Sequence, residues 1–351
     1  MNGGILNEAL ERFHRTGPEW GESQLTNHGP MAVEVLVRRG RTDEVHRWAD
    51  RYLRRLDIMP TGVAAITEET WPEALGDGRR VGDWTQYFTR QLAERPWRDV
   101  LATWWPRLLP GILAGTTHGV IRVGHAARAM LGGAESAATV AELAHGLAFW
   151  AARSRGVPVT EPAGGLTAAV ALDGLPRIAR QEGTVAARLG QLADLPQWPA
   201  SVASLRSPAA AEDVPALLAD VITAATLHYS RTGHASPVLL VHTATAPNAV
   251  LHTLPALPRE VWMPSLSAIW TVVAAVVSAY APARLAQRPY PPRRPAGADP
   301  VADVLDRAVD HGDEHVIKFT DTAVEVYTRT GNPDALAAAT HIMTLIDPVA
   351  D

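Results

Sequence analysis

The amino-acid sequence predicts an all-α protein in which residues 1–351 form one large multi-helix domain. Three observations support this fold class. Apolar residues recur at the three- and four-residue spacing of amphipathic helices over most of the chain. Strictly alternating apolar and polar residues, the pattern of a half-buried strand, are scarce. The 27 prolines stand mostly between the periodic stretches, where they end helices.

Helical periodicity marks six stretches in order along the chain. The first ends before Pro60, and the last follows a Pro/Arg-rich segment, 288–300, that we expect to be an exposed connection. That segment is short enough to lie inside one domain. The predicted helical stretches are 31–56, 96–109, 111–131, 137–153, 213–229 and 301–328.

A further apolar stretch, 261–283, carries no charged residue and has to be tested as a membrane span. Its strongly apolar part, 266–281, has 16 residues, whereas crossing a bilayer takes roughly 20. Serine and threonine interrupt the stretch, and no basic flank sets an orientation. We therefore expect a central buried helix and no membrane partner.

The composition excludes several classes of function. The formal net charge of −5 does not provide the concentrated basic face that nucleic-acid binding needs. The absence of cysteine excludes disulfides, thiolate metal ligands and cysteine nucleophiles. No secretory signal opens the sequence, so we expect a cytoplasmic protein. The oligomeric state is left open, a homodimer included.

Lys318 is the one lysine among 32 basic residues. On the last predicted helix it shares an inner stripe with His311 and His315, so we expect it to be buried. Burial disfavours the charged amine, and a neutral amine can act as a base, as a Schiff-base nucleophile or as an acceptor of carbon dioxide. The resulting carbamate would offer a metal an anionic oxygen. Alternatively, the side chain reaches the surface beside Asp321 or Glu314.

Histidines occupy apolar faces of four predicted helical segments, the last of them that of Lys318. His118 and His125 share a face, because they are seven residues apart among small residues that admit close helix packing. His242 lies about one and a half turns into a helix that starts at Ser236, and His28 lies in a turn that leads into a helix. Each histidine alone is typical of a hydrogen-bonded core. Together with a buried lysine they indicate a metal site, and imidazoles with one anionic oxygen favour non-haem iron over structural zinc.

Aromatic residues gather before the His118 segment, and the sequence carries 11 tryptophans in all. Core packing accounts for most of them. A flat aromatic substrate would nevertheless need such walls. We therefore take Trp84, Trp104 and Trp105 as candidate substrate contacts.

Five sequence blocks resemble the questin oxidase-like family, and together they extend from Asn27 to about Thr328. The resemblance implies an oxygenase of secondary metabolism that opens or cleaves the rings of anthraquinones and related aromatic polyketides, with a Baeyer–Villiger-like outcome. The blocks are NHGPMAVEVLVRRGR at 27–41, WADRYLRRL at 48–56, WWPRLLPGILAGTTHGVIRVGHAAR at 104–128, VHTATAPNAV at 241–250 and HGDEHVIKF at 311–319.

The resemblance also implies a ligand set. A relative in this family binds iron through four histidines and a carboxylated lysine, and the lysine would here be Lys318. His125 and His311 are reserve candidates, because they lie one or two turns away from the preferred histidines on the same faces. The preferred histidines, matched by motif, are His28, His118, His242 and His315.

We therefore expect an iron(II)-dependent oxygenase that uses dioxygen as co-substrate on a polycyclic phenol or quinone. No dinucleotide-binding fingerprint is present, which argues against bound NADPH or flavin. Two other functions stay open: a zinc-dependent hydrolase that uses the same histidines, and a non-catalytic binding protein in which they are merely buried. The sequence does not specify the substrate, or whether one or both oxygen atoms are transferred.

Overall fold

The computed structural model describes residues 3–283 and 299–349, and it is mostly helical, with 69% helix and 4% strand. This confirms the predicted all-α class. Contacts divide the chain into two compact units. Unit 1 comprises Met1–Pro158 and His252–Val261, and unit 2 comprises Val159–Leu251 and Trp262–Asp351. The prediction of a single domain stays a prediction.

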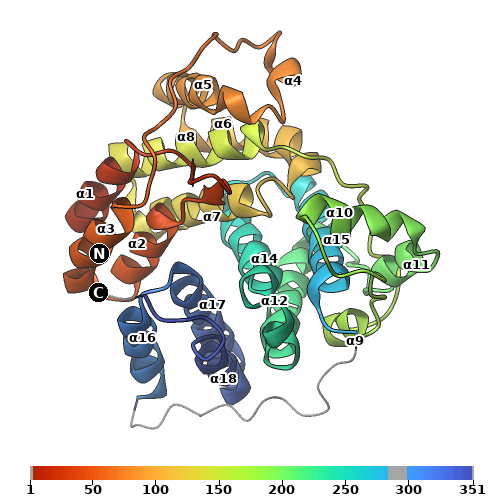
Figure 1. Ribbon diagram of the computed structural model, residues 1–351. Helices are drawn as coiled ribbons and strands as arrows, with labels where there is room; N and C mark the ends of the chain where they lie inside the picture. Colours follow the sequence, from red (N-terminus) through yellow and green to blue (C-terminus); the bar gives the residue numbers. More distant parts are fainter. Residues whose placement is uncertain (1–2, 284–298, 350–351) are drawn as a thin grey trace. The chain divides into compact units, whose positions relative to one another are not determined.

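Unit 1 consists of helices α1 to α8 and one short antiparallel hairpin (Figure 1). Its elements are α1 (Gly3–Phe13), β1 (Glu19–Trp20), β2 (Leu25–Thr26), α2 (Gly29–Arg38), α3 (Val45–Leu53), α4 (Trp71–Ala74), α5 (Val81–Glu94), α6 (Trp97–Leu108), α7 (His118–Ala129) and α8 (Ala137–Ala152). Helix α8 packs most extensively against α5 and α7. It starts with a capping box in which Ser136 and Thr139 bond each other's backbone N–H groups, and it matches the predicted stretch 137–153.

Two of the predicted stretches in unit 1 are shorter or divided, and the cause in each case is left-handed backbone. Gly40, with φ of 73°, ends the first stretch after α2, and the chain starts again as α3. The stretch predicted from residue 111 becomes helical only at His118. Immediately before it, Thr116 and Thr117 both have positive φ, 56° and 72°, which no α-helix accommodates.

Unit 2 contains the remaining helices. They are α9 (Ala168–Asp173), α10 (Val185–Gly190), α11 (Trp198–Ala203), α12 (Val214–Thr232), α13 (Pro237–Leu240), α14 (His242–Thr253, whose last two residues are assigned to unit 1), α15 (Trp262–Tyr280), α16 (Pro300–His311), α17 (Glu314–Thr330) and α18 (Pro333–Ile342). Helices α16, α17 and α18 pack side by side, and α12 packs against α9, α15, α17 and α18 (Figure 1).

The uncharged stretch forms α15, and all its residues from Ser265 to Tyr280 are buried. This confirms the predicted buried central helix. Among the described residues, the segment Arg259–Tyr280 is the one helix long and apolar enough to cross a membrane, and 83% of its most apolar window is buried inside the fold. Burial of that extent is typical of a core helix.

The prediction of one continuous helix over 301–328 is wrong. Gly312, with φ of 77°, ends α16 in the left-handed conformation, and Asp313 caps α17 by accepting the backbone N–H groups of His315 and Val316. His311 and His315 therefore belong to different helices. The predicted connection 288–300 lies almost wholly outside the described residues.

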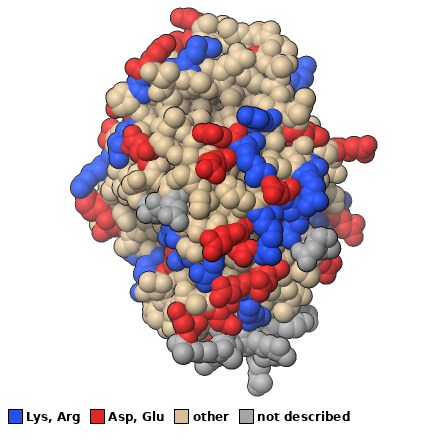
Figure 2. Space-filling view, turned by 90° about the vertical axis from the view of Figure 1, so that its left-hand side faces the viewer, with Lys and Arg blue, Asp and Glu red and all other residues tan. Residues whose placement is uncertain are grey.

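Charges of both signs are interspersed on the face shown in Figure 2. Unit 1 has exposed ion pairs of the expected kind, such as Arg12 with Asp50 and Arg47 with Glu44. Pairs of this kind contribute little to stability, since solvent screens them. The mixture of signs on this face does not form a concentrated basic surface.

Candidate metal-binding residues

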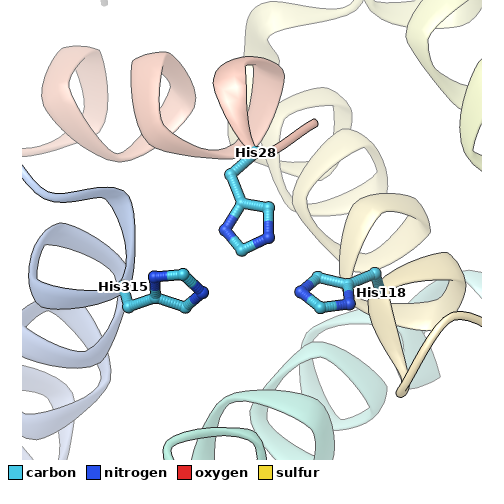
Figure 3. A group of neighbouring side chains, drawn as sticks. All are labelled: His28, His118 and His315. Atoms are coloured by element: carbon cyan, nitrogen blue, oxygen red, sulfur yellow. The ribbon is translucent and has the colours of Figure 1, made fainter. Parts of the chain in front are cut away.

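Two of the predicted ligands, His28 and His118, meet in unit 1. Their ring centroids are 4.5 Å apart at an interplanar angle of 44°, and a nitrogen of each ring lies within 4.8 Å of the other. Both side chains are buried. Figure 3 shows the two rings projecting from the starts of α2 and α7. Two converging nitrogens of this kind could bind one metal ion.

The turn before α2 fixes the backbone of His28. The Asn27 side chain accepts a hydrogen bond from Gly29 N–H at 2.9 Å and donates to the Gly17 carbonyl, also at 2.9 Å. The Tyr52 hydroxyl accepts the His28 N–H at 2.8 Å. His28 is the residue before the first turn, as the sequence predicted for a histidine at the start of a helix.

His118 is the first residue of α7, and its ring is oriented by the left-handed turn that precedes it. Its Nδ1 donates a hydrogen bond to the carbonyl oxygen of Gly115. Because Nδ1 carries the proton, the lone pair is on Nε2, the nitrogen that would bind a metal. Gly119 follows, and a Cβ there would lie 2.7 Å from the Cα of Trp150, so α7 starts in direct contact with the backbone of α8.

The other three predicted ligands lie in unit 2. The rings of His242 and His315 are 6.2 Å apart between centroids, at an interplanar angle of 74°. His242 is the first residue of α14, because the helix that starts at Pro237 is interrupted at Val241. Its Nδ1 donates to the Leu239 carbonyl at 3.2 Å, so its lone pair is also on Nε2.

Burial keeps His242 neutral. Burial is the largest cause, nearby Lys318 and His315 add to it, and together they lower the pKa of His242 to about 3. Neutral imidazole is the form that binds a metal. His315 lies in the first turn of α17, with Nδ1 at 3.4 Å from the Asp313 carboxylate. In Figure 3 its ring is drawn beside the start of that helix.

Lys318 is buried, with 3% of its surface exposed, so the alternative of a side chain reaching the surface is wrong. Burial lowers its pKa from 10.5 to about 8, and the carboxylates of Glu314 and Asp313 offset only part of that effect. Among the described residues, none forms a hydrogen bond or ion pair with the Lys318 amine. With a pKa of about 8, roughly a tenth of the amine is uncharged at pH 7, and this fraction can react with an electrophile.

The reserve candidates have other partners. His125 donates through Nδ1 to the Glu34 carboxylate at 2.7 Å. His311 donates through Nε2 to the Ile346 carbonyl at 3.0 Å, which ties the chain after α18 to the end of α16. Both assignments as ligands stay predictions, but the structure gives each ring a clear structural bond.

The three tryptophans predicted as substrate contacts are completely buried in unit 1. Trp84 and Trp104 contact each other edge to face at 5.5 Å, and Trp105 contacts Trp150 in the same way at 5.1 Å. This is aromatic core packing of the kind the sequence also predicted. Their contact with a substrate stays a prediction.

Sequence reasoning missed the residues that hold the histidines in place. Asp313 caps α17 beside His315, and the helical periodicity over 301–328 does not predict that cap. The Gly312–Asp313 pair was a readable signal of one helix ending and another starting. The Glu34 partner of His125 had no comparable signal, because it comes from a helix about 90 residues away in the sequence.

Comparison with known proteins supports the resemblance over part of the chain. The family model described as questin oxidase-like matches residues 41–164, roughly a third of the sequence. The match includes α7 with His118, whereas the blocks around His28, His242 and Lys318 lie outside it. No curated protein matches the chain. Over residues 41–164 the chain is therefore similar to the questin oxidase-like family, whose members are associated with activity of the oxygenase type.

Proposed function

We propose that this protein is a non-haem iron-dependent oxygenase that acts on a polycyclic aromatic or quinone substrate of the polyketide type. The expected outcome is oxidative ring opening or C–C cleavage. The family match over 41–164 supports the oxygenase class. The iron, the ligand set and the substrate class are the further content of the proposal.

One observation carries the metal assignment. His118 and His242 are each the first residue of a helix, and in both the Nδ1–H donates a hydrogen bond to a backbone carbonyl. The nitrogen with the lone pair that would bind a metal is then Nε2. Histidines that bind metals usually have their second nitrogen held in this way, because the bond fixes both the tautomer and the ring direction. With His28 and His315, the set offers four nitrogen donors, which fits iron, zinc, copper or nickel.

Lys318 supplies the feature that distinguishes iron within this set. Its uncharged amine can add to carbon dioxide, forming an N–C bond and releasing one proton, and the product is a carbamate. Its anionic oxygen would balance the positive charge of the metal. A mixed set of imidazoles and one carboxylate-like oxygen is typical of non-haem iron sites.

The chain's own residues then have defined tasks. The helix starts orient the imidazoles, and burial keeps that of His242 uncharged. Bound iron(II) would supply the activation of dioxygen. The aromatic core of unit 1 supports α7 from behind and, in this proposal, provides the apolar environment for a flat substrate.

Metal content tests the proposal. Untagged protein purified without oxygen should contain close to one iron per chain by inductively coupled plasma mass spectrometry. Lys318→Ala and His242→Ala should lose the iron. His228→Asn is the matched control, because His228 is a buried histidine outside the candidate ligand set, with Nδ1 at 3.3 Å from Thr232 Oγ1, and should be replaceable without loss of iron.

Each other result has a clear meaning. Full iron occupancy in Lys318→Ala would refute the role of the lysine. Stoichiometric zinc in the wild-type protein would favour the hydrolase. Absence of metal even after reconstitution with iron(II) would refute the metal centre and leave the histidines as core residues.

A further inference from the structure

Beyond the predicted ligands, α7 carries two buried arginines, and each is paired with a buried glutamate and a histidine. Arg128 bonds Glu34 of α2 through both Nε, at 3.1 Å, and Nη2, and Glu34 also accepts from His125. Arg122 bonds Glu142 of α8 through Nε at 2.5 Å and Nη2 at 2.9 Å. The third member of that network is His14, with Nε2 at 3.1 Å from Glu142.

The two networks have similar chemistry but connect different helices. Only the Glu34 network joins α2 to α7, the two helices that start at His28 and His118. The Glu142 network joins α7 to α8 and to the end of α1. The Glu34 and Glu142 networks therefore allow two buried ion pairs of the same helix, α7, to be compared within one protein.

The spacing along the two helices is nearly equal. Glu34 lies six residues after His28, and His125 lies seven after His118. At 1.5 Å per residue, the charged contact is about 9 Å from the histidine on α2 and about 10 Å on α7. The ring contact between His28 and His118 and the charged contact between Glu34 and His125 thus lie at matching distances along two helices that run in the same direction. Together the two contacts fix how α2 is rotated about its axis and how far it is shifted along α7.

We propose that Glu34 is a positioning residue which, through His125 and Arg128, sets the approach of His28 to His118. A bidentate bond from arginine to carboxylate has a fixed planar geometry, so it transmits orientation as well as attraction. Glu34 is 5% exposed and Arg128 9%, so water does not loosen the bond. The part of this inference that concerns metal affinity rests on the proposed function, whereas the part that concerns the ring approach does not.

Two isosteric variants compare the networks in the full-length protein. Glu34→Gln and Glu142→Gln each remove one carboxylate charge and leave a buried arginine without its counter-ion. Both should lower the urea midpoint of unfolding by similar amounts. A purely structural role of Glu34 predicts that the two variants behave alike in every other respect.

The first discriminating measurement needs no metal. With labelled histidine, nuclear Overhauser effects between the ring protons of His28 and His118 should be visible in the wild-type protein, whose ring centroids are 4.5 Å apart. The cross-peak should persist in Glu142→Gln and fall several-fold in Glu34→Gln. An undiminished cross-peak in Glu34→Gln overturns the proposal, as does an equal loss in both variants.

The second measurement uses Co²⁺ as a spectroscopic probe of affinity. Groups that orient metal ligands typically change affinity by about 10- to 100-fold when removed. We expect about a 10-fold weaker affinity for Co²⁺ in Glu34→Gln and a change of less than twofold in Glu142→Gln. Equal weakening in both overturns the proposal.

If the wild-type protein binds neither Co²⁺ nor iron(II), the proposed function fails and the ring cross-peak alone decides the role of Glu34. Should Glu34→Gln not fold, Arg128→Lys replaces it, because it keeps the charge, loses the bidentate geometry and has the same expected effects.

Discussion

The buried charge next to the predicted ligands of unit 1 is fully balanced, whereas the buried charge of the Lys318 amine in unit 2 is balanced only in part. Behind His28 and His118, the buried carboxylate of Glu34 is fully balanced by Arg128 and His125. Around Lys318, the carboxylates of Glu314 and Asp313 offset only part of the effect of burial on the amine. Burial therefore has different consequences in the two units. A buried charge with a fixed counter-ion makes a helix contact specific, whereas a buried amine that is only partly balanced shifts towards its uncharged form.

The largest effect should come from breaking a buried pair in unit 1. Glu142→Ala leaves the Arg122 guanidinium, which is 1% exposed, without its counter-ion. We expect the free energy of unfolding to fall by about 3–5 kcal/mol, measured by urea denaturation. Glu44→Ala is the control, because it removes the exposed partner of Arg47 and should cost less than about 1 kcal/mol. Equal losses in both variants would contradict the view that burial gives the pair its importance.

Acid should weaken the same contacts. Burial raises the pKa of Glu34 and of Glu142, but Arg128 and Arg122, together with His125 and His14, outweigh it and hold both pKa values at about 2. In the unfolded chain a glutamate has a pKa near 4.5. Because the folded pKa values are the lower ones, the stabilisation is complete above pH 4.5 and is lost as the pH falls towards 2.

The measurement is the free energy of unfolding between pH 6 and pH 2.5 in wild type and in Glu142→Gln. The wild type should lose a few kcal/mol over this range, and the variant should lose less, since one of the two titrating groups is absent. A slope that is the same in both proteins would contradict the assignment of the acid sensitivity to these carboxylates.

The starts of the helices show how far the sequence could predict the site. The His28 turn was readable, because Gly29 and Pro30 after Asn27 are typical of a helix start. The start at His118 was not, because threonine rarely adopts the positive φ that Thr116 and Thr117 share. Periodicity extended both the helix of His118 and that of Lys318 too far, since it records which face is apolar and not where the chain turns.

The partners of the histidines lay further beyond sequence reasoning. His125 and His118 share a face of α7, so spacing made them equivalent candidates. Only the fold brings Glu34 to His125 and His28 to His118. The burial of Lys318, by contrast, was predictable even though its helix was misjudged, because Lys318 and its apolar neighbours lie within the uninterrupted part of α17.

A third prediction concerns the packing that fixes His118. Gly119→Ala would ordinarily stabilise a helix by up to about 1 kcal/mol. Here the added methyl group would lie 2.7 Å from Trp150 Cα, a backbone atom that cannot move aside without shifting α8. We expect a net loss of about 1–3 kcal/mol in the free energy of unfolding. Gly190→Ala is the matched control, because nothing lies within 4 Å of a Cβ at that position. A stabilised Gly119→Ala would show that α7 and α8 are less tightly packed than described.

The smallest predicted effect is also the one that most sharply separates the two units. Lys318→Met keeps a side chain of similar length and removes the amine whose pKa burial lowers to about 8. In metal-free protein at pH 7, we expect the free energy of unfolding to rise by roughly 1 kcal/mol, because the cost of burying the charged amine exceeds the partial compensation from Glu314 and Asp313 that is lost with it. Ile317→Met, at the adjacent buried position, controls for methionine itself and should cost less than about 1.5 kcal/mol. If Lys318→Met instead lost several kcal/mol, the amine would be stabilising the fold in the way that Arg122 and Arg128 do in unit 1. A gain in stability would mean that the fold retains Lys318 at a cost, which is the signature of a side chain kept for its chemistry.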